Sequence, residues 1–121
     1  GDRLWAAVRS GRLQVRTHKF FCAPLAFHDM PDDLAAEFAT ATMTVMKGDL
    51  NYRRLVGDRY WPATTPFGQT VDYFPSPVTA LRTLKSEVVV GLTSEQLAEL
   101  DASGQRWRTT GEYALIQVRV D

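Results

Sequence analysis

Several features are scarce or missing in this sequence of 121 residues. It contains one cysteine, Cys22, which cannot form a disulfide within the chain. Basic and acidic residues are equal in number, 14 of each, whereas a nucleic-acid-binding domain is usually clearly basic. The longest apolar stretches, such as residues 88–90, fall far short of the roughly 20 residues that a membrane-spanning helix needs. No signal-peptide pattern opens the chain. We therefore expect one cytoplasmic domain that binds neither nucleic acid nor membrane.

The charges are balanced overall but separated along the chain. Residues 1–20 carry five cations and one carboxylate, whereas residues 21–41 carry four carboxylates and no Lys or Arg. Blocks of this kind are most often solvated helix faces, and a binding patch is the alternative.

Hydrophobic periodicity predicts helices and strands in alternation. Helices are expected at residues 2–10, 31–41, 50–56 and 94–103, the last from a capping box formed by Thr93 and Gln96. Strands are expected at residues 13–20, 42–47, 84–92 and 114–120, and a proline-rich loop at residues 60–77. This alternation predicts an α/β fold with helices on both faces of a sheet, in which ligands bind at the carboxyl ends of the strands.

The segment KGDLNYRR, residues 47–54, is the best candidate for such a site. Gly48 permits a tight turn before a helix, and the free N–H groups at a helix N-terminus bind anions, phosphate above all. Asp49 could cap the helix or meet a cation, and Arg53 offers a planar fork that matches phosphate oxygens. From spacing alone, an ordinary capped helix with surface arginines remains an alternative.

The remaining polar residues give weaker signals. Arg82 and Lys85, in the segment RTLK, could equally lie on a solvated edge. His18 and His28 lack the spacing of metal ligands, and Ser76 lacks the glycine-flanked turn of serine hydrolases. Cys22 has no cations nearby that would activate it, so we expect a buried thiol. No catalytic triad is found.

Taken together, residues 47–67, 80–92 and 107–117 resemble the metal-dependent damage-control phosphatases. The closer likeness is to the branch that includes the acidic residue methyltransferase proteins and carries an RTxK motif. That motif is matched by Arg82, Thr83, Leu84 and Lys85, and the DLNYR segment of the branch is present as Asp49, Leu50, Asn51, Tyr52 and Arg53. The resemblance continues upstream and covers nearly the whole chain.

The resemblance implies a three-layer, Rossmann-like α/β/α fold that hydrolyses sugar phosphates such as fructose 1-phosphate with a divalent metal. Residues 49–53 would hold the substrate and Lys85 its phosphate, with Arg82 and Thr83 supporting them. The catalytic residues stay unassigned. In the family, the metal is held by an Asp–Asn pair and a further Asp that precede everything seen here. We therefore expect residues 1–121 to be the C-terminal part of a larger domain and inactive alone. Manganese, cobalt, nickel or magnesium would then be bound mainly by the N-terminal remainder of the enzyme, with no metal ligand assigned in this chain.

Two other functions stay open. The first, also implied by the resemblance, is a carboxyl methyltransferase that uses S-adenosylmethionine. The sequence supports it little, because no glycine-rich loop of the GxGxG type is present. The second is a non-catalytic domain that binds sugar phosphates.

Overall fold

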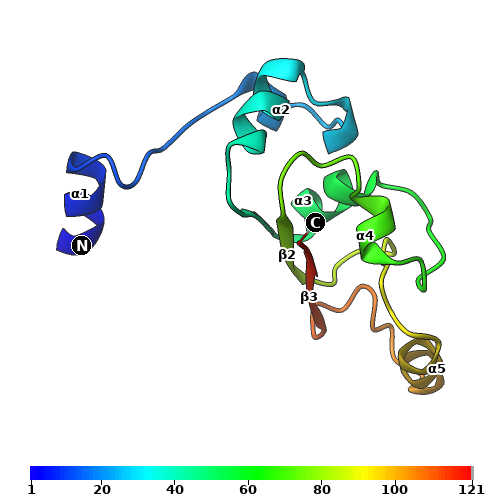
Figure 1. The fold of residues 1–121 in the computed structure, drawn as a ribbon. Coiled ribbons are helices and arrows are strands. Elements are labelled where there is room, and N and C mark those ends of the chain that lie inside the picture. Colours follow the sequence, from blue (N-terminus) through cyan, green and yellow to red (C-terminus); the bar gives the residue numbers. More distant parts are fainter. Residues whose placement is uncertain (121) are drawn as a thin grey trace.

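The computed structural model describes residues 1–120, which form a small α/β structure with an N-terminal arm (Figure 1). The helices are α1 (Asp2–Arg9), α2 (Asp32–Ala39), α3 (Asp49–Val56), α4 (Phe67–Thr70) and α5 (Ser94–Ala102), with two 3-10 turns, η1 (Lys19–Cys22) and η2 (Phe27–Asp29). The strands are β1 (Thr44–Lys47), β2 (Val78–Thr83) and β3 (Ala114–Arg119). The predicted α/β class is therefore confirmed. The four predicted helices are confirmed as well, and so are the strands predicted at residues 42–47 and 114–120.

The three strands form a mixed sheet in the order β1-β2-β3. β1 pairs with β2 in parallel, with Met46 opposite Ala80, and β2 pairs with β3 in antiparallel orientation. One face of the sheet carries the buried side chains of β1 and β2 and packs against α3, while α4 packs against β3. Within residues 1–120 the opposite face is exposed, with Val45 and Ile116 among its apolar side chains.

The core lies between this covered face and the helices. Its fully buried side chains include Tyr52 and Leu55 of α3, Val78 of β2, and Val90. A second cluster joins Leu84 and Trp107 beneath α5. Thr93 and Gln96 form the predicted capping box, which fixes the start of α5.

The strand predicted at residues 84–92 is wrong, although residues 88–90 are buried as expected. The backbone of Val90 forms its hydrogen bonds with side chains instead of with a neighbouring strand. The Val90 N–H donates to the Tyr52 hydroxyl at 3.2 Å, and the Val90 carbonyl accepts from Gln117 Nε2 at 2.7 Å. The strand lies earlier, in β2, so Arg82 and Thr83 end a strand rather than precede one.

The strand predicted at residues 13–20 is also wrong. Residues 14–18 have no regular structure, and with α1 they form an arm that extends away from the body (Figure 1). Leu13 and Val15 alternate with polar residues, but no described strand lies beside them to accept their backbone hydrogen bonds. Cys22 is exposed, so the prediction of a buried thiol is wrong too.

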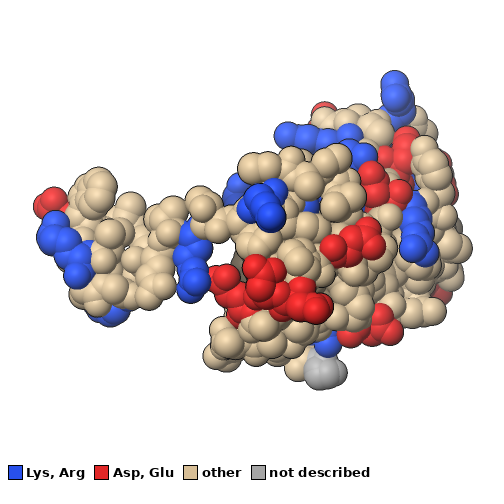
Figure 2. Space-filling view, turned by 90° about the horizontal axis from the view of Figure 1, so that it is seen from above, with Lys and Arg blue, Asp and Glu red and all other residues tan. Residues whose placement is uncertain are grey.

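The two charge blocks of the sequence meet where the arm joins the body. Arg16 Nε lies 2.9 Å from Glu37 Oε1, and His18 Nε2 lies 3.2 Å from Asp33 Oδ2. The hydrogen bond from His18 lowers the pKa of Asp33. Figure 2 shows carboxylates gathered on the body beside the base of the arm. No helix within residues 1–120 is long and apolar enough to cross a membrane.

Candidate functional site

The two motif segments meet at one edge of the sheet. β1 and β2 are parallel neighbours, so their carboxyl ends lie together, and DLNYR follows β1 while RTLK spans the end of β2. The Gly48 N–H donates to the Leu81 carbonyl at 2.8 Å. Gly48 has a φ of 98°, a conformation that favours glycine, and α3 starts at the next residue. The site thus lies where ligands bind in open α/β sheets.

Arg82 and Asp49 form the central contact of this site. Arg82 Nε and Nη2 each lie 2.8 Å from Asp49 Oδ1, and the Arg82 side chain is completely buried. Its guanidinium also donates to the Val88 carbonyl and, at 2.8 Å, to Ser86 Oγ, and it lies 4.3 Å from the centre of the Tyr52 ring. All three guanidinium nitrogens therefore bind protein atoms, and Arg82 positions the residues around it.

Asp49 connects the start of α3 to the segment that follows β2. Its Oδ1 accepts from Ser86 Oγ at 3.1 Å and from the Lys85 backbone N–H at 3.4 Å. Asp49 does not cap its own helix, and Gly48, the N-cap residue, has no side chain to do so. The first N–H groups of a helix have no partner inside the helix, so the N-terminus of α3 presents donors suited to an anion.

The other residues of DLNYR divide into surface and core. Leu50 is 62% exposed, and Asn51 Nδ2 donates to the Lys47 carbonyl at 2.9 Å. Arg53 is held in a two-pronged ion pair, with Nε 2.8 Å from Asp58 Oδ1 and Nη2 3.0 Å from Asp58 Oδ2, which raises the pKa of Arg53. These three residues are accessible to a ligand.

Tyr52 is fully buried beneath the site. Its hydroxyl donates to Gln117 Oε1 at 2.9 Å and accepts from the Val90 N–H at 3.2 Å. Burial raises the pKa of Tyr52. The side chain of Tyr52 thus supports the site from below rather than facing a ligand.

Lys85 brings its backbone to Asp49, but its side chain lies elsewhere. Lys85 is exposed, and its Cε and Cγ lie beside Gly111, where an added Cβ would be 3.6 Å from Cε. Thr83 is exposed at the end of β2. The structure therefore brings the Asp49 carboxylate together with the Arg82 side chain and the Lys85 backbone N–H. No described contact links Lys85 to Arg53.

Comparison with known proteins identifies the family of this chain. The model of the family described as "Damage-control phosphatase ARMT1-like domain" matches residues 1–100. The chain belongs to this family. It is 44% identical over 118 residues to mouse damage-control phosphatase ARMT1, covering 93% of this chain and 27% of that protein. The human and zebrafish proteins of the same name are 41% and 39% identical, and each match covers 91% of this chain. The chain spans about a quarter of the length of these relatives.

This member of the ARMT1-like family does not form a metal site from its described residues. Within residues 1–120, no group of three or more His, Cys, Asp or Glu side chains is placed to hold a metal ion. A hard divalent cation needs several oxygen ligands, and Oδ1 of Asp49 already accepts from Arg82 and Ser86. The expectation that the metal is bound mainly by residues outside this chain stays a prediction.

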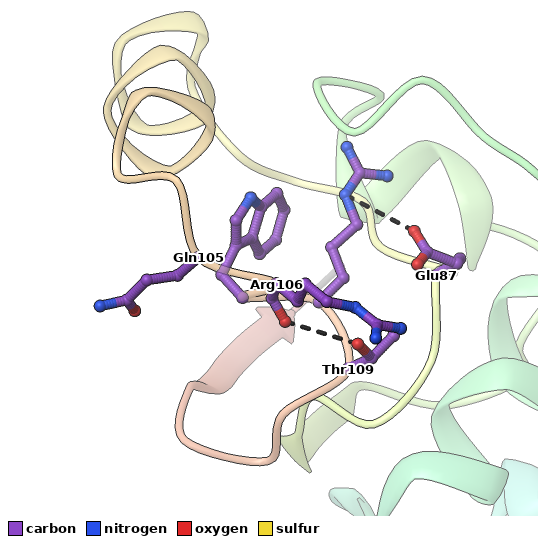
Figure 3. Close-up of a pocket in the computed structure, with 6 residues that line it drawn as sticks. Glu87, Gln105, Arg106 and Thr109 are labelled. Carbon is purple, nitrogen blue, oxygen red and sulfur yellow. Dashed lines mark hydrogen bonds and ion pairs between the residues drawn. The ribbon is translucent and has the colours of Figure 1, made fainter.

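Two small cavities lie beside the site in this ARMT1-like chain, and Glu87 lines both. One, of about 330 Å³, is bordered by Arg53, Asp58 and residues 86–88. The other, of about 180 Å³, is bordered by residues 105–109 (Figure 3). Between Glu87 Oε2 and Arg108 Nε the distance is 4.0 Å, and Arg108 stacks on Trp107 at 4.7 Å.

Sequence reasoning missed Ser86, Asp58, Glu87 and Gln117. Ser86 directly follows the RTLK segment, so its position was a signal that could have found it. Gln117 reaches Tyr52 across 65 positions of sequence, and nothing local predicts that contact.

Proposed function

We propose that this chain forms the substrate-phosphate part of the active site of a metal-dependent phosphatase that acts on sugar phosphates such as fructose 1-phosphate. The observation that carries the proposal is the buried Asp49–Arg82 contact, which holds the DLNYR and RTLK segments together beside the uncapped N-terminus of α3. Membership of the damage-control phosphatase family supports the reaction class. The sugar-phosphate substrate and the metal are parts of the proposal.

The residue types suit the chemistry of phosphoryl transfer. Negative charge spreads over the phosphoryl oxygens in the transition state, and positioned N–H groups and cations stabilise it. The N–H groups at the start of α3 would supply such donors. The ammonium of Lys85 would supply another after its exposed side chain turns from Gly111 toward the start of α3. Arg53 uses two of its five N–H donors on Asp58, so three remain for a phosphate.

In this proposal the metal is manganese, cobalt, nickel or magnesium, bound mainly by residues outside this chain. The proposal also includes a three-layer α/β/α domain, in which the remainder of the enzyme covers the exposed face of the sheet.

The test is phosphate release from fructose 1-phosphate by the full-length protein, with manganese, cobalt or a chelator. We expect activity with metal and its loss with chelator. Lys85→Ala and Arg53→Ala should each lower kcat/KM by about 10²-fold, the usual effect of removing one donor to a developing oxyanion. Lys19→Ala, a change at an exposed lysine of η1, serves as the matched control and should retain activity.

Three results would contradict the proposal. Near-normal rates in both variants, with unchanged melting temperatures, would remove Lys85 and Arg53 from the site. Methyl transfer from labelled S-adenosylmethionine without phosphate release would favour the methyltransferase. Binding of fructose 1-phosphate by calorimetry without turnover would indicate a non-catalytic domain.

A further inference from the structure

The cavity of about 330 Å³ lies directly beside the proposed phosphate site. Its polar lining residues are Arg53, Asp58, Arg59, Tyr60, Ser86 and Glu87. Two of them connect it to the phosphate site. Ser86 donates to Asp49 Oδ1 at 3.1 Å, and Arg53 lies one helical turn after Asp49 on α3. A molecule whose phosphate lies at the start of α3 could therefore extend into this cavity.

The walls of the cavity carry two carboxylates, Asp58 and Glu87. Arg53 holds Asp58 through two hydrogen bonds, so the negative charge of Asp58 is already paired. Glu87 faces Arg108 across a longer distance of 4.0 Å, and its side chain is 54% exposed (Figure 3). An ionised carboxylate is purely an acceptor, so Glu87 can accept hydrogen bonds from the hydroxyl groups of a ligand.

Tyr60 adds an aromatic ring at the edge of the same cavity. The residue is 89% exposed, so nearly the whole ring is accessible. An aromatic face packs well against apolar C–H groups while its hydroxyl stays in water. The cavity volume lies at the small end of the range of about 300–1,000 Å³ for ligand pockets, which suits a small metabolite.

We infer that this cavity binds the polyol part of the phosphorylated substrate, with Glu87 accepting from its hydroxyl groups and the Tyr60 ring packing against its carbon face. The inference rests on the proposed function and extends it, because it assigns substrate selectivity to residues outside the DLNYR and RTLK segments.

The test separates sugar binding from phosphate binding in the full-length protein with its metal. The KM for fructose 1-phosphate reports on both parts of the site, whereas inhibition by inorganic phosphate reports on the phosphate part alone. Glu87→Gln and Tyr60→Ala should each raise the KM about tenfold with little change in kcat. This pattern is expected because the lost contacts would stabilise the bound substrate and the transition state equally. The inhibition constant of inorganic phosphate should change less than twofold.

Two further variants sharpen the comparison. Tyr60→Phe keeps the ring and should raise the KM less than Tyr60→Ala does. Glu99→Gln removes a carboxylate from the exposed surface of α5 and serves as the matched control for Glu87→Gln. Its KM should match that of the unsubstituted protein.

The outcomes distinguish this inference from the proposed function. Equal shifts in KM and in the phosphate inhibition constant would overturn it, because the variants would then act on the phosphate site. An unchanged KM in both variants would overturn it as well. If the unsubstituted protein releases no phosphate from fructose 1-phosphate, the proposed function fails and this inference fails with it.

Discussion

At the scale of single residues, Arg82 is the most buried charged side chain at the site. It is fully buried, and its guanidinium nitrogens contact Asp49, Ser86 and Val88. Arg82→Met would leave Asp49 without its charged partner, and breaking a buried ion pair costs about 3–5 kcal/mol. Urea unfolding of the full-length protein should show this loss. Arg106→Met, at an exposed arginine, should change stability by less than about 0.5 kcal/mol. Equal stability of the two variants would contradict the structural role of Arg82.

A second prediction at this scale concerns Tyr52 and the dependence of folding stability on pH. Burial raises the pKa of Tyr52 above the usual value of about 10, so its contribution to stability is full below that pH. The contribution is lost as pH rises through the folded pKa, because the unfolded chain releases the proton first. Tyr52→Phe should therefore flatten the alkaline decline in stability. Part of the decline should remain, because burial also raises the pKa of Tyr73.

The same substitution has an opposite effect at neutral pH. Without the hydroxyl, the buried Val90 N–H loses its acceptor, which costs about 1–3 kcal/mol. Melting temperatures at neutral pH and across the alkaline range check both effects. An alkaline decline as steep in Tyr52→Phe as in the unsubstituted protein would show that Tyr52 does not cause it.

At the scale of elements, local signals predicted structure best where an element depends on its own residues. α5 has its capping box, and α3 follows a glycine turn, so both were predictable. β2 was missed because its six residues follow a proline-rich loop and depend on partners at residues 44–47 and 114–119. Residues 88–90 have the composition of a buried strand, but the Val90 backbone is satisfied by side chains of α3 and β3, and the Val88 carbonyl by Arg82 of β2. The proximity of DLNYR and RTLK was anticipated from a family resemblance, whereas the contacts of Ser86 and Gln117 depend on tertiary structure.

A substitution at Gly91 tests how tightly the segment after β2 is held against α4 and β3. It has a φ of 77°, and an added Cβ would lie 2.3 Å from Gln117 Nε2 and 3.3 Å from Phe67 Cβ. Gly91→Ala should displace Gln117 from Val90. Gly104, with a φ of 70° and no neighbour within 4 Å of an added Cβ, is the matched control. Gly104→Ala should cost about 1–2 kcal/mol from backbone strain alone, and Gly91→Ala clearly more in the same urea titration. Equal costs would mean that the segment adjusts freely.

At the scale of the whole molecule, the exposed face of the sheet is the main feature that residues 1–120 leave uncovered. Val45, Ile116 and Val118 lie on this face and are 56%, 76% and 50% exposed, and the β2 residues between them are Thr79 and Leu81. Proteins rarely expose contiguous apolar surface without a partner. The chain also spans only about a quarter of the length of its relatives. The proposed three-layer domain accounts for this surface if the remainder of the enzyme packs on it.

This proposal predicts that one added negative charge has a strong effect on stability at one exposed position and little effect at another. In the full-length protein, Ile116→Asp would bury a carboxylate in an apolar interface, so it should lower the melting temperature strongly or prevent folding. Ala98→Asp, on the exposed surface of α5, should have little effect. If Ile116→Asp is as stable as Ala98→Asp, the face is open to solvent and the second helical layer is absent.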